Sequence, residues 1–326
     1  MNEHRRIKVG LVGTGYAARK RAEAFCGDER SQLTLVTGHN LESTTAFCQT
    51  YSSTAIASWQ QLVTEQIDLV AICTINCNHS MIARAALEAG KHVVIEYPLA
   101  LNANQAQYLI TLAKNKGKLL HVEHIELLGG VHQTIRQYLA TIGPVFSARY
   151  LTVSPKHPAP RRWTYNHDLY GFPLTAALSR IHRLTDLFGK VTSVSCQARF
   201  WNLPNSPCYT ACLCNAQLGF HNGLIAEISY GKGDKFWQGR RTFELYGHQG
   251  LITFEGQKGM LIRGKEKIPL EVGIRRGSFA QDTSMVLDNL LDNKPLYVEP
   301  QASLYALKVA DAARLSAQTG KTVDLV

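Results

Sequence analysis

Residues 7–18, with the sequence IKVGLVGTGYAA, decide the fold, because a compact apolar run leads directly into a glycine-rich turn. Ile7–Val12 is predicted to be a buried strand, and Tyr16–Cys26 is predicted to be the helix that follows it. Gly13 permits the tight turn, and Gly15 lets the backbone approach a pyrophosphate. In this setting the pattern G-x-G-x-x-A predicts a dinucleotide site at a helix N-terminus. The predicted cofactor contacts in this turn are Gly13, Thr14, Gly15, Tyr16, Ala17 and Ala18.

The end of the second predicted strand bears on the choice of cofactor. NAD sites usually place an Asp or Glu there to hold the ribose 2′-hydroxyl, but this strand ends Val36-Thr37-Gly38-His39. This strand end has no carboxylate that would repel a 2′-phosphate. Thr37, His39 or Arg19 could instead contact that phosphate, so NADPH is favoured over NADH. His39 and Arg19 could equally be solvated surface residues. Further cofactor contacts are predicted where later strands end, at Thr74, Ile75, Asn76, Glu96 and Tyr97.

The pattern of apolar residues changes between the two halves of the chain. Short apolar runs alternate with helical patterns over residues 1–124, which predicts an N-terminal Rossmann domain with a doubly wound parallel sheet. Residues 125–326 carry strand-like runs joined by short turns, which predicts an α+β domain with a large, mostly antiparallel, open sheet. The fold class is therefore α/β. A final helix is predicted over residues 303–319 and could pack back on the first domain.

Composition and charge narrow the class of protein. Of the 326 residues 45% are apolar and 18% charged, which is ordinary for a globular chain. The formal charge of +10 favours an anionic partner, and its thin spread favours a small anion over nucleic acid. No apolar run approaches the ~20 residues of a membrane span. The eight cysteines lack zinc-like spacing and are expected to be free thiols of a cytosolic protein. The protein is expected to be a monomer or a dimer.

Three motifs occur in an order that resembles the glucose–fructose oxidoreductase and inositol dehydrogenase family: GTGYAA at 13–18, CTINCNHS at 73–80 and AGKHVVIEYPLA at 89–100. Three longer segments, 91–101, 116–128 and 171–189, resemble the branch of that family that reduces biliverdin, particularly its cyanobacterial members. The resemblance implies a dinucleotide-binding domain joined to a large C-terminal sheet. It also implies hydride transfer from NADPH to the central methine carbon of biliverdin, with protonation of a pyrrole nitrogen, giving bilirubin.

The chain departs from the sugar-oxidising members of this family at Glu96-Tyr97-Pro98. Those members have Glu-Lys-Pro, and their lysine assists removal of a proton from a carbinol. A tyrosine with an ordinary pKa near 10 is a poor base at neutral pH. The carboxylate and histidine that the family carries in its middle helix are also missing from residues 174–180. Alcohol oxidation therefore loses its general base, and reduction of an unsaturated, anionic substrate is favoured.

Two residues are the predicted catalytic groups. Arg180 matches the arginine of the Ser-Arg block in the bilin-reducing branch, and the resemblance implies that it orients the bilin and stabilises charge on the reacting ring. A guanidinium hardly deprotonates, and Arg180 could instead form a structural ion pair with Asp186 or Glu126. Tyr97 lies at the carboxyl end of a predicted strand, where open α/β sheets bind ligands. Further substrate contacts are predicted at Glu123, Glu126, Arg183 and Asp282.

Two other polar segments invite a functional interpretation. Residues 121–126 contain two histidines and two glutamates, but their spacing is not H-E-x-x-H, and an extended segment would split the ligands between two faces. No metal site is therefore predicted. Residues 156–165 form a basic, proline-bearing segment that could cover the active site and meet a propionate, or could be a solvated loop.

The sequence thus predicts an NADPH-dependent enzyme that reduces biliverdin. One alternative is an oxidoreductase of the same family that acts on a sugar, a cyclitol or an imine, and the missing lysine and histidine count against it. The other is a bilin- or nucleotide-binding regulator without turnover. The intact glycine-rich turn argues against that regulator, and binding without product formation would select it.

Overall fold

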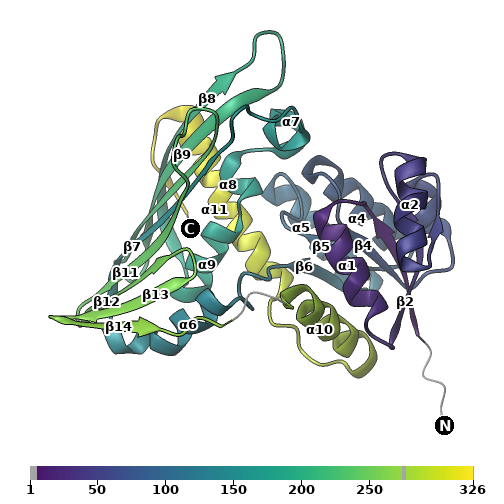
Figure 1. Ribbon diagram of the computed structural model, residues 1–326, viewed down its shortest axis with the longest axis horizontal. Helices are drawn as coiled ribbons and strands as arrows, with labels where there is room; N and C mark the ends of the chain where they lie inside the picture. The colour runs from purple at the N-terminus through teal and green to yellow at the C-terminus, as the bar shows by residue number, and fades with distance from the viewer. Residues whose placement is uncertain (1–5, 274–276, 326) are drawn as a thin grey trace. The chain divides into compact units, whose positions relative to one another are not determined.

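The computed structural model describes residues 6–273 and 277–325, which divide into two compact units (Figure 1). The first unit comprises residues 6–125 and 277–304. The second comprises residues 126–273 and 305–325. The chain therefore returns to the first unit after leaving it. The predicted division into two domains at residues 124 and 125 does not include this return.

The first unit is built on a sheet of six parallel strands. These are β1 Ile7–Val12, β2 Ser31–Thr37, β3 Thr54–Ala55, β4 Leu69–Ile72, β5 His92–Glu96 and β6 Leu120–Glu123. They lie in the order β3-β2-β1-β4-β5-β6, so the strand order reverses between β1 and β4. Ligands bind outside the carboxyl ends of the strands at such a reversal. The predicted doubly wound parallel sheet is confirmed.

Helices complete this unit, and their ends follow from local sequence. They are α1 Tyr16–Cys26, α2 Leu41–Tyr51, α3 Trp59–Thr64, the 3-10 turn η1 Asn76–Asn78, α4 His79–Glu88, α5 Ala103–Lys116 and α10 Ser278–Asp292. Ser58 caps α3 by accepting a hydrogen bond from the amide of Gln61, a role that serine favours. Val286 of α10 lies in one core with Phe25 of α1 and Leu11 of β1. Burial of this apolar side chain holds α10 in the first unit.

The second unit carries one mixed sheet of nine strands. These are β7 Val145–Pro155, β8 Val191–Asn202, β9 Tyr209–Phe220, β10 Ile225–Gly233, β11 Arg240–Gly247, β12 Gly250–Glu255, β13 Lys258–Arg263, β14 Glu266–Leu270 and β15 Val323–Asp324. Their order is β14-β13-β12-β11-β7-β10-β9-β8-β15. The β7–β10 pair is parallel and the other pairs are antiparallel, so the predicted, mostly antiparallel sheet is confirmed.

One face of this sheet is covered by helices (Figure 1). They are α6 Gly130–Tyr138, α7 His167–Tyr170, α8 Pro173–Ala176, α9 Ser179–Phe188 and residues 305–319 of α11 Pro300–Thr319, with 3-10 turns η2 Leu139–Ile142 and η3 Trp163–Tyr165. The Ser316 hydroxyl of α11 accepts a hydrogen bond of 2.9 Å from the amide of Cys196 in β8. None of the helices within the described ranges is long and apolar enough to cross a membrane.

The sequence pattern of residues 172–188 predicts one continuous helix, and that prediction is wrong. The chain forms α8 and α9 instead, and Ala177, with φ −102° and ψ 36°, leaves helical geometry between them. Ala and Leu are strong helix formers, so the sequence gives no local signal for this break. The break places α9, which carries Arg180 and Arg183, as a separate element on the sheet.

Candidate functional site

The glycine-rich turn is held between the ends of neighbouring strands. The amide of Gly13 donates a hydrogen bond of 2.7 Å to the carbonyl of Thr37, at the end of β2. Gly13 has a φ of 120°, and a Cβ there would lie 2.2 Å from the carbonyl oxygen of Cys73, which follows β4. Only glycine fits this position, because both the backbone conformation and the space exclude a side chain.

The next glycine leaves open the space that an anion would fill. A Cβ on Gly15 would find no atom within 4 Å, and Gly15 is the N-cap residue directly before α1. Within the described ranges no side chain caps α1, and its first turn holds no acidic residue. The free amides at this N-terminus are therefore available to a pyrophosphate, which fits the predicted dinucleotide.

Replacing Gly15 with Ala is expected to weaken NADPH binding at least tenfold while leaving the melting temperature unchanged. The methyl group meets no protein atom but occupies the predicted pyrophosphate position. Gly13→Ala is the matched comparison, because it must lower both affinity and melting temperature. Fluorescence titration with NADPH and thermal melts measure the two effects. Wild-type affinity in Gly15→Ala would show that the pyrophosphate lies elsewhere.

The residues predicted around the cofactor differ in exposure. Thr37 is buried at the end of β2, whereas His39 and Arg19 are exposed and remain available to a 2′-phosphate. Thr74 and Ile75, directly after β4, are half-buried. The carboxyl ends of β1, β2 and β4 thus bring together the residues predicted from three separate segments.

Glu96, at the end of β5, is held by an arginine that the sequence analysis did not identify. Arg21 of α1 is fully buried, and its Nε donates to Glu96 Oε1 at 3.1 Å. Its Nη1 donates to Asp282 Oδ2, and Asp282 Oδ1 also contacts His121 Nε2 at 2.8 Å and accepts from Tyr297 Oη at 2.6 Å. Burial opposes ionisation of Asp282, but Arg21 and His121 outweigh it and hold its pKa well below the usual range.

The prediction that Asp282 contacts substrate conflicts with this placement. The carboxylate has no exposed surface, and both of its oxygens are engaged inside the first unit. Glu123 is also buried, and its Oε1 accepts from the amide of Ile125 at 2.6 Å. Both carboxylates therefore have structural partners, and neither faces solvent.

Tyr97 follows β5 and is half-buried. Its ring stacks on His124, with centroids 5.4 Å apart and an interplanar angle of 4°. The His124 amide donates to Tyr297 Oη at 3.0 Å, and His124 Nε2 lies 2.9 Å from Ser303 Oγ. The stacked ring fixes the direction in which the Tyr97 side chain points.

Arg180 lies on α9 in the second unit. Its guanidinium carbon is 5.5 Å from the ring centroid of Tyr230 in β10, and its Nη1 donates to Ser179 Oγ at 2.9 Å. Asp186, one predicted ion-pair partner, instead accepts from His132 at 2.8 Å and from Arg136 at 2.6 Å. The position over an aromatic ring orients the guanidinium by a cation–π contact.

Two other predicted substrate contacts, Arg183 and Glu126, lie in the same unit. Arg183 is buried, and its Nη2 donates to the carbonyl of Glu126 at 3.3 Å. Glu126 Oε1 lies 3.3 Å from His182 Nδ1. Glu126 and Arg183 are thus brought together on the α9 side of the second unit.

A tyrosine that the sequence analysis missed is surrounded by arginines in this unit. Burial opposes ionisation of Tyr150 in β7, but Arg183, Arg180 and Arg241 outweigh it and lower its pKa to about 8. Arg241 Nη2 donates to Tyr150 Oη at 3.3 Å. Three cations around one phenol form a site suited to an anion and to proton transfer near neutral pH.

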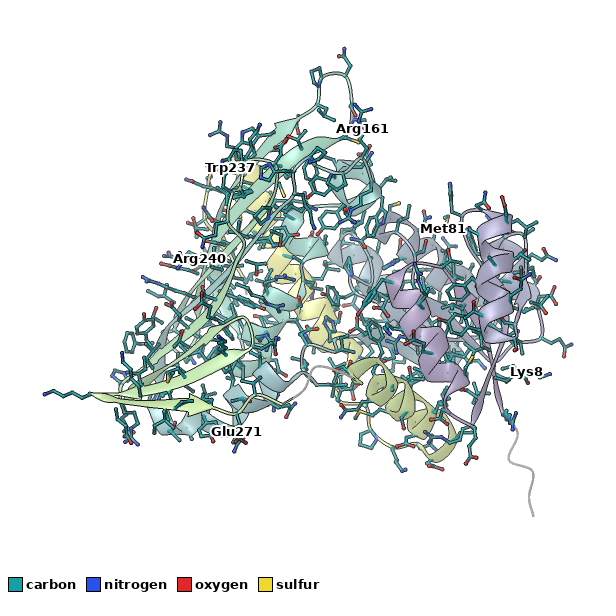
Figure 2. All side chains as sticks on the ribbon, in the orientation of Figure 1. Lys8, Met81, Arg161, Trp237, Arg240 and Glu271 are labelled. Carbon is teal, nitrogen blue, oxygen red and sulfur yellow. The ribbon has the colours of Figure 1, made fainter. Side chains whose placement is uncertain are left out.

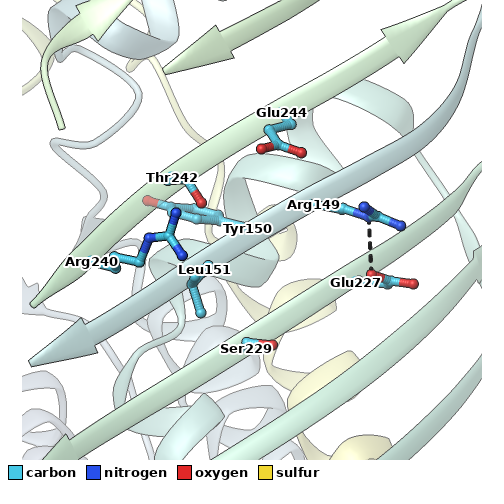
Figure 3. A pocket seen from close by; sticks show the side chains of 8 residues that line it. All are labelled: Arg149, Tyr150, Leu151, Glu227, Ser229, Arg240, Thr242 and Glu244. Carbon is cyan, nitrogen blue, oxygen red and sulfur yellow. Dashed lines mark ion pairs between the residues drawn. The ribbon is translucent and has the colours of Figure 1, made fainter. Parts of the chain in front are cut away.

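The other face of the sheet carries a shallow hollow (Figure 3). It is lined by Arg149, Tyr150, Leu151, Glu227, Ser229, Arg240, Thr242 and Glu244. Arg149 Nε and Glu227 Oε2 form an exposed ion pair at 3.2 Å. Exposed ion pairs of this kind contribute little to stability.

Comparison with known proteins identifies the family. Residues 7–124 match the model of an oxidoreductase family with an NAD-binding Rossmann fold, and residues 139–325 match its C-terminal alpha/beta domain. The chain therefore belongs to this oxidoreductase family. Levoglucosan dehydrogenase, at 17% identity and a TM-score of 0.86 over 99% of each chain, shares the fold alone.

Other relatives carry a specific name. The crystal structure of a biliverdin reductase from Synechocystis sp. PCC 6803, in complex with biliverdin and NADP+, has a TM-score of 0.94. It is 55% identical over 96% of this chain and 99% of that one. Human biliverdin reductase A is 27% identical over 77% of this chain and 76% of its own length. The mouse enzyme is 35% identical, but that match spans only 42% of its length.

Proposed function

We propose that the protein reduces biliverdin to bilirubin with NADPH. The observation that carries the proposal is 55% identity, over nearly the whole of both chains, with a biliverdin reductase whose structure holds biliverdin and NADP+. Tyr97 stands where sugar-oxidising members have lysine, so an alcohol substrate would lack its base. The eight free cysteines of the described chain suit a reducing compartment, and we place the reaction in the cytoplasm.

The two units supply different parts of the reaction. Bound NADPH would supply the hydride that reaches the central methine carbon. Gly13 and Gly15 would hold its pyrophosphate against the N-terminus of α1, and Glu96 would accept hydrogen bonds from the nicotinamide ribose. Arg180 orients the bilin and stabilises negative charge on it, since guanidinium is permanently cationic.

The proton for the pyrrole nitrogen requires a group that can release one. A guanidinium cannot do so at neutral pH. Tyr150, whose pKa the surrounding arginines lower to about 8, is protonated at pH 7 and can give up its proton. We assign Tyr150 as the proton source for the pyrrole nitrogen. The arginines around it also suit the two propionates of biliverdin.

The proposal is tested by following the visible spectrum of purified protein with NADPH and biliverdin. A falling red band and a rising blue band, together with NADPH consumption, support the reductase. A shifted bilin spectrum without NADPH consumption would identify a bilin-binding regulator instead. If neither changes, the bilin assignment fails, and sugars, cyclitols and imines are the next substrates to screen.

Tyr150→Phe is expected to remove an alkaline limb from the pH profile. In the wild type, kcat/KM should fall as pH rises through about 8, because ionised Tyr150 has lost its proton and neutralises its arginines. The variant should have kcat lowered roughly 100-fold, with no further fall near pH 8. Steady-state kinetics from pH 6 to 9.5 measure this. Tyr246→Phe, on the same sheet, is the control, and an unchanged limb in Tyr150→Phe would exclude the assignment.

A further inference from the structure

A buried lysine in the second unit has no part in the reaction as described so far. Lys232 of β10 is only 6% exposed. Its Nζ lies 3.5 Å from the ring centroid of Tyr170, 4.7 Å from that of Tyr165 and 5.4 Å from that of Tyr209. Buried lysines are rare unless they are paired, and here three aromatic faces surround the ammonium group.

The same ammonium group fastens a segment of irregular chain to the sheet. Lys232 Nζ donates a hydrogen bond to the carbonyl of Thr164, which also accepts from Tyr209 Oη at 3.1 Å. Thr164 belongs to residues 162–170, which contain η3 and α7 and which we call segment 162–170. Two donors from neighbouring strands thus converge on one carbonyl of this segment.

Segment 162–170 has further attachments to the sheet and to the loop between β8 and β9. Asn166 Nδ2 donates to Cys208 Sγ at 3.6 Å, and His167 Nε2 lies 2.9 Å from Asn202 Oδ1. The amide of His167 donates to the carbonyl of Pro207 at 2.9 Å, and the His167 ring contacts that of Tyr209 in a tilted arrangement with centroids 4.9 Å apart. Immediately before it, Arg161 is exposed, at the same end of the sheet as Trp237 (Figure 2). Among these attachments, the bond to the Thr164 carbonyl is the one that a buried ammonium group donates.

A tyrosine pair connects the segment to Arg180. Tyr170 Oη lies 3.1 Å from Tyr230 Oη, and Arg180 sits over the Tyr230 ring. Tyr230 and Lys232 are two residues apart on β10, so their side chains leave the same face of the sheet. A displacement of segment 162–170 would move Tyr170 and alter the surroundings of Arg180.

We propose that Lys232 is a positioning residue for the substrate site: its ammonium group holds segment 162–170 on the sheet and thereby fixes Tyr170 and Tyr230 beside Arg180. The effect on substrate rests on the proposed bilin reductase activity. The hold on segment 162–170 does not, and it can be measured without bilin or NADPH.

The charge of Lys232 makes this contact sensitive to pH. Burial lowers the pKa of Lys232 to about 7; Cys212 opposes this shift, and Arg162 adds to it. As pH rises through about 7 the amine loses its proton, and with it the cation–π contacts and one donor. The contact is therefore strongest below pH 7 and weakens above it.

The other titratable groups of the cluster do not change charge in the same way. Burial raises the pKa of Tyr165, Tyr170, Tyr209 and Tyr230, so these phenols stay neutral at pH 7. Burial likewise raises the pKa of Cys212 to about 11. The remaining titratable or charged groups nearby are Arg162, His167 and Asp234. His167 is the one imidazole among these groups, and it therefore receives its own control variant.

The first test follows tryptophan fluorescence of the ligand-free protein from pH 5.5 to 9. Trp163 lies in segment 162–170, 5.8 Å from the Tyr170 ring, so it reports on the segment, and Trp163→Phe assigns its signal. The wild type should show a step with a midpoint near pH 7. Lys232→Met should abolish that step, whereas His167→Gln and the surface variant Lys190→Met should keep it. A step that persists in Lys232→Met, or that disappears in His167→Gln, would overturn the proposal.

The second test measures the effect on substrate. At pH 6, Lys232→Met should raise KM for biliverdin at least fivefold and change kcat less than twofold. Lys232→Arg keeps its charge at every pH, so its KM should stay low above pH 7. A loss confined to kcat would contradict a positioning role. Absence of turnover in the wild type would defeat the proposed function, while the fluorescence step would still decide the role of Lys232.

Discussion

Asp282→Asn is expected to lower the free energy of unfolding by about 3–5 kcal/mol, because it leaves a buried charge without its main partner. Arg21 and Asp282 are both fully buried and form an ion pair within the first unit. The neutral amide cannot balance the Arg21 guanidinium, and Glu96, at 3.1 Å, is the charged partner that the structure gives it besides Asp282. The amide also keeps only one acceptor oxygen, so its NH2 group must face either Arg21 or the pair His121 and Tyr297.

Thermal and urea unfolding of Asp282→Asn measure this effect, and a fall in melting temperature of roughly 10 °C is expected. Asp288→Asn is the matched control, because Asp288 lies on the same helix but pairs with Arg30 at the surface. The pKa of Asp282 is lower in the folded protein than in the unfolded chain. Its contribution to the free energy of unfolding is therefore fully present above about pH 4, and it is lost as pH falls through the pKa of the folded protein. An Asp282→Asn protein no less stable than Asp288→Asn would contradict the structural role.

Much of the first unit could be predicted because its signals are local. The bounds of β1 and α1 match the prediction, since an apolar run, two glycines and an alanine define them within 20 residues. β4 is a continuous apolar run that is buried along its length, as is typical of a parallel strand covered on both faces. The short strands β3 and β15 were not predicted. Each has two residues, which are too few to show the alternation of apolar and polar side chains that indicates a strand.

The interactions that define the candidate site are harder to predict because they join distant segments. Arg21 and Asp282 are separated by 261 positions, and no property of either residue alone indicates the partner. Asp282 was therefore predicted to face substrate, although the structure buries it. The low pKa of Tyr150 likewise depends on arginines from α9 and β11. Lys232 did leave a signal: it continues the buried face that Tyr230 begins, an unusual place for an isolated lysine.

Arg180→Ala is expected to lower kcat for biliverdin reduction about 100- to 1000-fold, which is the usual cost of removing one preorganised charge from a developing anion. The side chain is half-buried over the Tyr230 ring, so its charge acts where water is partly excluded. Removing it also withdraws one of the cations that lower the pKa of Tyr150. Without this cation the pKa of Tyr150 should rise, so the phenol ionises only at higher pH. The alkaline limb near pH 8 should therefore move above the pH range that is measured.

Single-turnover measurement of bilirubin formation separates this effect from binding. Arg180→Lys retains a charge but not the planar guanidinium, so it should recover only part of the rate. Arg149→Ala is the control, since its exposed pair with Glu227 lies on the other face of the sheet (Figure 3). A variant that raises KM but keeps kcat would make Arg180 a binding group only, because an interaction that acts in the transition state must lower kcat as well. Full activity in Arg180→Ala would instead restrict the residue to packing against Tyr230.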